Sequence, residues 1–359
     1  MQIDAKEEIW PLRQVFRISR GSRAEANVVV VSLNDGEHIG RGEGVPIRRY
    51  NQSIESVLAQ IEPINREKDL NRNRLQQLLP AGAARNALDC ALWDLEAKRS
   101  GKRVWELPDF GNAYCSRRSV GDAHASNPPS ERYSAARSEA AAADRIHLDQ
   151  VETSFTISLD TTDAMGAAAA AHASAPILKL KLGGDDLDLP RVEAVRIAAP
   201  NARLIVDANE SWSIGHYRKI VPRLKKIGVE LIEQPFPAGT DDVLESLDRP
   251  IPVCADESCH TTADLPRLSK RYDAVNVKLD KTGGLTEALR LCARARESGF
   301  KLLIGCMVCT SLGIAPARLL AAAAEWVDLD GPLLLARDRE HPIPYTAGQI
   351  GVPPRELWG

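Results

Sequence analysis

The feature that most constrains this chain is a run of short apolar segments whose ends are polar residues or glycine at a nearly constant spacing. From residue 151 onward these ends recur every 22 to 27 residues. They are Lys181, Asp207, Glu233, Asp256, Lys278, Gly305 and Asp328. The interval is the length of one strand, one helix and two loops, so the pattern predicts repeated β–α units around a parallel sheet.

The region holds eight candidate strands, from TSFTISL and APILKLKL at its start to FKLLIGC and EWVDLDG at its end. Eight β–α units close a (β/α)₈ barrel, and we predict such a TIM-like α/β barrel over residues 151–335. An open doubly wound sheet is the alternative. We favour the barrel because of the strand count and because the chain has no dinucleotide-binding fingerprint.

The first third indicates a separate α+β module, predicted over residues 1–111. EANVVVVSLNDGEHIGRGEGVP predicts two strands joined by an Asp-Gly turn. Two helical segments follow, SIESVLAQIEPIN with Ser53 as its N-cap and AARNALDCALWDLEAKRSGK. Residues 112–150 are rich in Ala, Ser and Arg and have no core-forming period, so we expect a linker or a surface insertion there.

Charge and composition exclude several classes of function. The net charge of −3 and the pI near 6.2 do not favour nucleic acid binding. No segment approaches the roughly 20 apolar residues of a membrane span, and the N-terminus does not resemble a signal peptide. Seven cysteines without a disulfide-type framework indicate a reducing compartment. We therefore expect a cytoplasmic protein without nucleic acid or membrane partners.

Three strand-end acids predict a metal site. Asp207, Glu233 and Asp256 follow three successive apolar runs, and side chains at the C-terminal ends of barrel strands meet at the mouth. Three carboxylates so close would repel one another unless a cation neutralised them, and an all-oxygen set suits Mg²⁺, with Mn²⁺ as the other candidate. For any single acid the alternative is a helix N-cap in a βα loop.

The lysines of ILKLKLGG and NVKLDKTGG predict a pair of bases. The leucines of the first segment would face the helices, so Lys179 and Lys181 would point into the barrel, with Lys278 on the opposite side. A free lysine has a pKa of about 10.4 and is a poor base at neutral pH. Neighbouring ammonium groups, a metal and partial desolvation would lower that pKa. The alternative is a solvated strand face.

Five motifs in order, KLK, DAN, EQP, DES and NVK, resemble those of the enolase superfamily, in its muconate-lactonizing subgroup. The resemblance covers nearly the whole chain. It implies a capping domain that closes over the barrel mouth, with the C-terminal segment 336–359 returning to complete it. It also implies that Lys181 and Lys278 are the catalytic bases, that Lys179 polarises the substrate carboxylate and that the three acids bind the metal.

Within this subgroup the sequence is most similar to dipeptide epimerases of the L-Ala-D/L-Glu type. VDLDGP places Asp328 and Asp330 where such enzymes hold the substrate's α-ammonium group, and two acids away from the metal suit a cationic ligand. A helix cap plus a loop acid is the alternative. By the same resemblance Arg20, in RISRGSR, pairs with a glutamate side chain, and Tyr50 helps to cover the site.

The reaction that the resemblance implies is a 1,1-proton transfer. The metal stabilises the enolate of the dipeptide, one lysine removes the α-proton, and the other returns a proton to the opposite face. A small-molecule dipeptide is then the substrate, peptidoglycan recycling is the implied setting, and we expect a homo-oligomer.

Other functions compete with this hypothesis. N-acylamino-acid racemization, o-succinylbenzoate synthesis and cycloisomerization would use the same machinery, but their substrates carry no free ammonium for Asp328 and Asp330. An acid-sugar dehydratase is disfavoured because no His-Asp pair occurs at the sixth and seventh strand ends. A non-catalytic barrel would have no use for two opposed lysines beside a metal site.

Overall fold

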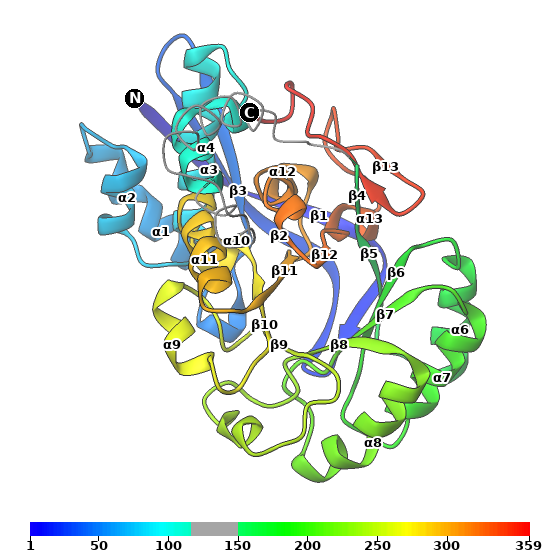
Figure 1. Cartoon of the computed structure of the whole chain (residues 1–359). Coiled ribbons are helices and arrows are strands. Elements are labelled where there is room, and N and C mark those ends of the chain that lie inside the picture. The colour runs from blue at the N-terminus through cyan, green and yellow to red at the C-terminus, as the bar shows by residue number, and fades with distance from the viewer. Residues whose placement is uncertain (116–149) are drawn as a thin grey trace, which may run out of the picture.

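The structure is a computed structural model that describes residues 1–115 and 150–359. The chain begins with an antiparallel sheet, drawn in blue in Figure 1. In it β2 (Gly21–Asn34) pairs with both β1 (Gln2–Ile18) and β3 (Ile39–Gly44). Strands β2 and β3 confirm the predicted hairpin. The long strand β1 was not expected, because its many charged residues hide the alternation of a strand.

Helices pack against this sheet, and α3 lies closest. A Cβ atom on Gly40 or Gly42 of β3 would lie 2.2 or 2.1 Å from a carbonyl oxygen of α3, so glycine permits the contact. Ser53 accepts a hydrogen bond from the Ser56 amide and caps α1, as predicted. The helices of this region are η1 (Arg48–Tyr50), α1 (Ile54–Ile61), η2 (Glu62–Arg66), α2 (Arg72–Leu78), α3 (Ala83–Ser100), η3 (Val104–Glu106) and α4 (Pro108–Cys115).

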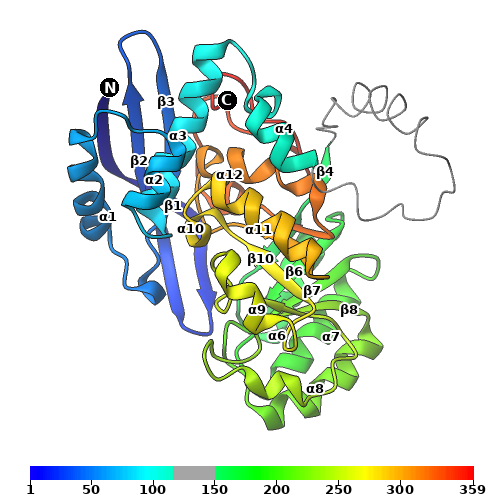
Figure 2. The same cartoon turned by 60° about the vertical axis from the view of Figure 1, so that its left-hand side comes forward.

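The second region is a sheet of eight parallel strands in chain order (Figures 1 and 2). They are β5 (Ser154–Ile157), β6 (Ile177–Lys181), β7 (Arg203–Asp207), β8 (Val229–Glu233), β9 (Val253–Ala255), β10 (Ala274–Val277), β11 (Lys301–Gly305) and β12 (Trp326–Asp328). The two outer strands approach each other, since Ser154 Oγ donates to Asp328 Oδ1 at 2.6 Å. The sheet is therefore the nearly closed barrel that the sequence predicts.

The two faces of β6 show why leucine and lysine alternate in it. Leu178 and Leu180 are fully buried in the core cluster that also contains Val192 and Val195 of α7. Lys179, between the two leucines, contacts acids from other strands inside the barrel. A separate apolar cluster consists of Ile177, Ile205, Leu231, Cys254, Ala274, Leu303 and Trp326.

Helices and short turns connect the strands and cover the outside of the barrel, as α6, α7 and α8 do in Figure 1. These elements are α6 (Thr162–Ala171), α7 (Asp188–Ala198), α8 (Ile214–Ile227), η4 (Asp242–Glu245), η5 (Thr262–Asp264), α9 (Leu265–Leu268), α10 (Leu279–Thr282), α11 (Leu285–Glu297), α12 (Ser311–Arg318), η6 (Ala321–Ala323) and α13 (Gly331–Leu334).

The last residues of the chain lie against the N-terminal region. The indole nitrogen of Trp358 donates to the carbonyl of Cys90, and the Gly359 amide donates to Asp94 Oδ1, both in α3. Before them β13 (Tyr345–Thr346) and β14 (Gln349–Ile350) form a small sheet with β4 (Val151–Glu152). The segment 112–150 that we interpret as a linker or insertion lies, apart from its ends, outside the described residues.

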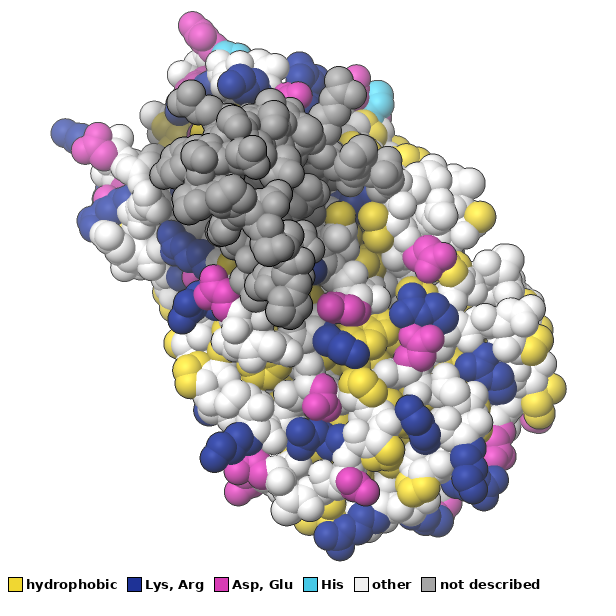
Figure 3. Space-filling model, in the orientation of Figure 1, with side chains coloured by type: hydrophobic (Ala, Val, Ile, Leu, Met, Phe, Trp, Pro, Cys, Tyr) yellow, Lys and Arg dark blue, Asp and Glu magenta, His cyan; other side chains and the backbone are white. Residues whose placement is uncertain are grey.

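The described surface carries charges of both signs. On the face in Figure 3, Lys and Arg side chains lie interspersed with Asp and Glu. Within residues 1–115 and 150–359, no helix combines the length and the apolar character that a membrane crossing requires.

Candidate active site

The three lysines singled out in the sequence lie on opposite sides of the barrel mouth. Lys179 and Lys181 belong to β6, and Lys278 directly follows β10, four strands further along the sheet. In a ring of eight strands, a separation of four places two residues across the cavity from each other. All three side chains are buried.

The three acids come from the strands between these lysines. Asp207 ends β7, Glu233 ends β8 and Asp256 follows β9. The register pairs Lys181 with Asp207, and Asp207 with Glu233. Parallel pairing therefore brings the acids to the same end of the barrel, where all three are buried.

Each lysine forms a buried ion pair with this set. Lys181 Nζ lies 2.5 Å from Asp207 Oδ2, and Lys278 Nζ lies 2.7 Å from Asp256 Oδ2. Lys179 Nζ lies 2.6 Å from Glu233 Oε2. The positive charges of the site are thus balanced by direct contact with carboxylates.

These contacts set the direction of the lysine pKa shifts. Burial alone would lower the pKa of Lys179, but Asp328 and Glu233 raise it well above its ordinary value. Burial also opposes the shift at Lys278, where Asp256 has the main part in raising the pKa. The sequence suggested lowered lysine pKa values. The direction is opposite here because touching carboxylates outweigh both burial and neighbouring ammonium groups.

A divalent cation fits the chemistry of this donor set. Glu233 Oε2 and Asp256 Oδ1 are buried and form no hydrogen bond, although the ammonium nitrogens of Lys179 and Lys281 lie 2.6 Å from them. Within the described residues, no three His, Cys, Asp or Glu side chains are arranged so that they could already hold a metal ion. Lysine ammonium groups lie between the carboxylates instead. A bound Mg²⁺ would compete with those ammonium groups for the same oxygens.

The two acids at the end of β12 lie on the wall of the same cavity. Asp328 Oδ1 accepts from Ser154 Oγ, and its Oδ2 accepts from Lys179 Nζ at 2.6 Å. Asp330 Oδ2 accepts from the Thr156 amide at 2.6 Å. Burial, and then the charge of Asp328, raise the pKa of Asp330 to about 7. A cationic ligand group would relieve the repulsion between the two acids.

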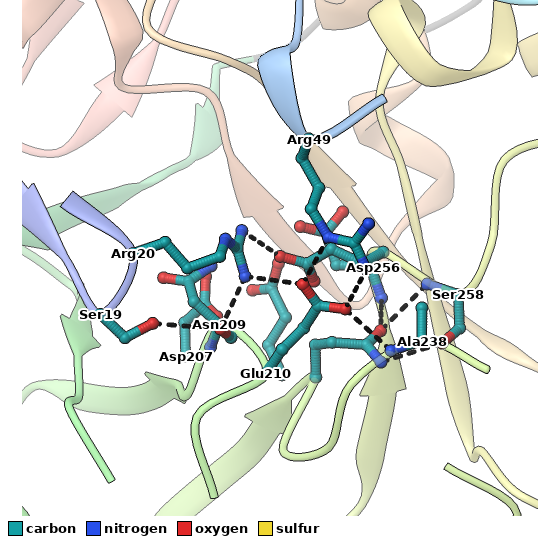
Figure 4. A network of polar contacts seen from close by, with 12 residues as sticks. Ser19, Arg20, Arg49, Asp207, Asn209, Glu210, Ala238, Asp256 and Ser258 are labelled. Carbon is teal, nitrogen blue, oxygen red and sulfur yellow. Dashed lines mark hydrogen bonds and ion pairs between the residues drawn. The ribbon is translucent and has the colours of Figure 1, made fainter. Parts of the chain in front are cut away.

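The predicted capping residues, Arg20 and Tyr50, also line the cavity. Arg20 is already paired with barrel acids, because it donates to Glu257 Oε1 at 2.5 Å and to Glu210 Oε2 at 3.0 Å (Figure 4). The ring of Tyr50 lies edge-on to that of His260, with centroids 4.3 Å apart.

Two functional candidates were missed in the sequence. Arg23 lines the cavity, and among the ion pairs of the described residues none involves it; burial and then Arg48 lower its pKa. Lys281 is buried and donates to the carbonyls of Asp256 and Asn276 at 2.5 and 2.9 Å. The signals were present as the second arginine of RGSR and the second lysine of KLDK.

One cavity thus collects side chains from both regions of the chain. The capping side contributes Phe16, Ile18, Arg20, Arg23, Arg49 and Tyr50. The barrel side contributes Thr156, Lys179, Lys181, Asp256, Lys278, Lys281, Asp328 and Asp330. Asp207 and Glu233 lie next to it, in contact with Lys181 and Lys179.

The fold and this site together define the class of protein. The family profile described as "Enolase C-terminal domain-like" matches residues 163–356, and "Mandelate racemase / muconate lactonizing enzyme, N-terminal domain" matches residues 2–108. The chain belongs to the enolase superfamily, in its mandelate racemase and muconate lactonizing enzyme branch.

Particular relatives narrow this class. The chain is 44% identical over 349 residues to the L-Ala-D/L-Glu epimerase of Escherichia coli (strain K12), covering 96% of this chain and 97% of that protein. It is 43% identical over 336 residues to an N-acetyl-D-glutamate racemase of Pseudoalteromonas sp., covering 92% and 95%. A solved enolase family member from Agrobacterium tumefaciens with bound sodium and L-Ala-L-Glu, described as homologous to dipeptide epimerases, superposes with a TM-score of 0.87 at 43% identity over 99% of both chains.

Proposed function

We propose that this protein is a metal-dependent isomerase that inverts the α-carbon of the C-terminal residue of a dipeptide of the L-Ala-D/L-Glu type. The observation that carries the proposal is the pair of buried lysines, Lys181 and Lys278, on strands four apart with three carboxylates on the strands between them. The similarity to an L-Ala-D/L-Glu epimerase supports the same substrate class.

In this proposal the substrate α-carbon lies between the two lysines. One lysine takes the α-proton in its neutral form, which requires that its nitrogen first leave the carboxylate that it contacts in this structure. The protonated lysine on the other side gives a proton to the opposite face. A divalent cation held by Asp207, Glu233 and Asp256, Mg²⁺ or Mn²⁺, would supply Lewis-acid stabilisation of the charge that develops. Lys179 adds a fixed positive charge beside that position.

Both ends of the dipeptide have complementary groups in the cavity. Asp328 and Asp330 are proposed to hold the α-ammonium group. Arg20 is the partner first predicted for the glutamate side chain, but two acids already neutralise it. Arg23 lines the cavity and pairs with none of the described acids, so we assign the glutamate carboxylate to Arg23 and a supporting role to Arg20.

Racemization of an N-acylated glutamate is the second candidate function. It is favoured by the 43% identity to an N-acetyl-D-glutamate racemase. It is also favoured by the contact of Asp328 with Lys179, because an acid that already holds an ammonium group is less available for a second. The dipeptide remains the better match, because Asp330 has no such ammonium partner among the described residues.

The test is α-proton exchange in D₂O with Mg²⁺, followed by mass spectrometry. L-Ala-L-Glu and a library of alanyl dipeptides are compared with N-acetyl-L-glutamate at equal concentration. The proposal expects deuterium incorporation with inversion in alanyl-glutamate, at a kcat/KM well above that for the N-acetyl compound. The reverse order would establish the racemase, and no metal-dependent exchange with either would exclude both.

The setting follows from the substrate. We propose that the enzyme works in the cytoplasm and recycles alanyl-glutamate from peptidoglycan, as the resemblance implies for this dipeptide. We also propose a homo-oligomer, which sedimentation velocity would test directly.

A further inference from the structure

Two segments of the capping region are fastened to the barrel by one carboxylate. Arg49 donates from Nε and Nη2 to the two oxygens of Glu210, at 2.9 and 3.0 Å. Arg20, from a different loop, donates to the same carboxylate at 3.0 Å. Figure 4 shows the two guanidinium groups approaching Glu210 from different sides. We call Glu210 with these two arginines the latch.

Glu210 is held firmly on the barrel side. Its side chain is only 6% exposed, its Oε1 accepts from the Ala238 amide at 2.8 Å, and its own amide donates to the Gln234 carbonyl. Asn209 and Glu210 both have left-handed backbones, with φ of 44° and 69°, which asparagine adopts readily but which is unfavourable for glutamate. The turn that follows Asp207 is therefore a constrained support for the latch.

The latch also explains why Arg20 is not free for a substrate anion. Besides Glu210, Arg20 donates to the Asn209 carbonyl at 2.6 Å and to Glu257 at 2.5 Å. Ser19, next to it, donates to the same carbonyl at 3.1 Å. The loop is thus tied to residues that lie one to three positions after Asp256 and Asp207.

We propose that Glu210 is a positioning residue that holds the loop 19–23 and the turn 48–50 over the cavity during each turnover. These segments contribute Arg23 and Tyr50 to the lining of the cavity. Without the charge of Glu210, Arg20 keeps Glu257, but Arg49 loses its partner in the described structure. The proposal rests on the proposed function, because it requires a substrate that enters beneath these segments.

The test combines hydrogen exchange with kinetics on Glu210→Gln. The matched control is Glu245→Gln, whose carboxylate pairs with Arg271, and neither residue lines the cavity. We expect exchange in the peptide covering 47–52 to rise roughly tenfold, as for the loss of one charge-assisted contact. Exchange in the peptide covering 17–24 should rise less, because Arg20 keeps Glu257, and residues 26–34 of β2 and all of β3 should be unchanged. KM for L-Ala-L-Glu should rise by about the same factor and kcat should change little, whereas the control matches wild type in every measurement.

The outcomes are distinguishable. Wild-type exchange in both segments of Glu210→Gln would overturn the latch, whatever the activity. Increased exchange in an enzyme that does not epimerize dipeptides would keep the latch and remove the proposed function. If Glu210→Gln does not fold, Arg49→Met is compared with Arg271→Met instead. An increase in exchange confined to residues 47–52 of Arg49→Met supports the latch. Exchange equal to that of Arg271→Met overturns it.

Discussion

The floor and the roof of the cavity use charge in different ways. The floor consists of buried lysines and acids, each within a barrel strand or no more than two residues after its end. The roof consists of residues 16–23 and 47–50, whose arginines Arg20 and Arg49 are 33% and 42% exposed. Side chains at the ends of buried barrel strands are held more precisely than those at the tip of the β1–β2 hairpin and in the turn 48–50. We therefore expect the reacting groups in the floor and the choice of substrate in the roof.

The difference also sets the size of the effects to expect. Removing one partner of a buried ion pair leaves an uncompensated charge and costs about 3–5 kcal/mol. An exposed pair is worth about 0–1 kcal/mol. The latch lies between these limits, because its carboxylate is buried and its arginines are not. Changes in the floor should therefore stop the chemistry, and changes in the roof should alter selectivity.

The largest effect is expected for the two opposed lysines. Lys181→Ala and Lys278→Ala should each lose epimerization by roughly a thousandfold or more, since inversion needs a base on each face. Lys278→Ala should still exchange the α-proton of L-Ala-L-Glu with D₂O, and Lys181→Ala that of L-Ala-D-Glu. The measurement is NMR of each variant with each isomer.

Lys179→Ala is the control for that comparison. Its proposed role is electrostatic and does not depend on which face of the substrate loses the proton, so the change should impair exchange of both isomers alike. Near-normal epimerization by Lys181→Ala or Lys278→Ala would refute the two-base mechanism. Loss of exchange for both isomers in both variants would mean that removing either lysine disrupts the whole site, so that neither lysine could be assigned to one isomer.

The second effect concerns the metal. Glu233→Gln should lose more than the roughly 10–100-fold in metal affinity that a supporting residue contributes, and turnover should fall with it. Mn²⁺ binding followed by electron paramagnetic resonance reads the affinity without activity. EDTA should abolish turnover in the wild type while circular dichroism stays the same. Full activity of the metal-free enzyme would contradict the assignment of the three acids.

A smaller effect is expected at the end of β12. Asp330→Asn should lower kcat/KM for dipeptides roughly 10- to 150-fold, which corresponds to a loss of about 1.5–3 kcal/mol of transition-state stabilisation. The kcat/KM for N-acetylglutamate should not change. Asp328→Asn should impair both substrates, because it also removes a partner of Lys179. Unchanged dipeptide kinetics in both variants would place the ammonium group elsewhere and favour the racemase.

The smallest effect separates two arginines of the roof. Arg23→Gln should lower kcat/KM for L-Ala-L-Glu about tenfold, as expected for one charge-assisted contact, and change little for L-Ala-L-Met. Arg20→Gln should affect both dipeptides equally, because its contacts are to the barrel. The measurement is kcat/KM of each variant with each dipeptide. A selective loss of L-Ala-L-Glu activity in Arg20→Gln, and not in Arg23→Gln, would assign the glutamate contact to Arg20.

The floor could be predicted from sequence because a repeating β–α unit has a fixed length, and parallel strands bring their ends to one place. Lys181, Asp207 and Glu233 share a register that follows from pairing alone. The direction of the lysine pKa shifts could not be predicted, because it depends on separations of 2.5 to 2.7 Å between lysine nitrogens and carboxylate oxygens.

The roof was harder to predict for a different reason. Arg49 and Glu210 are 161 residues apart, and their contact depends on how the capping region meets the barrel. Arg20 was identified from its motif, but its pairing with Glu257 depends on how the capping region packs against the barrel. The strand β1 was overlooked because its exposed, charged residues carry almost no apolar period.

The turn from Asp207 to Glu210 limits how this architecture can be recombined. The same four residues provide a carboxylate for the floor and the anchorage of the roof. A chimaera that joins the first 108 residues of another family member to this barrel would bring its own arginines to a foreign residue 210. The capping region is therefore not an interchangeable module, and a functional chimaera must keep its arginines together with the residue at position 210 that they contact.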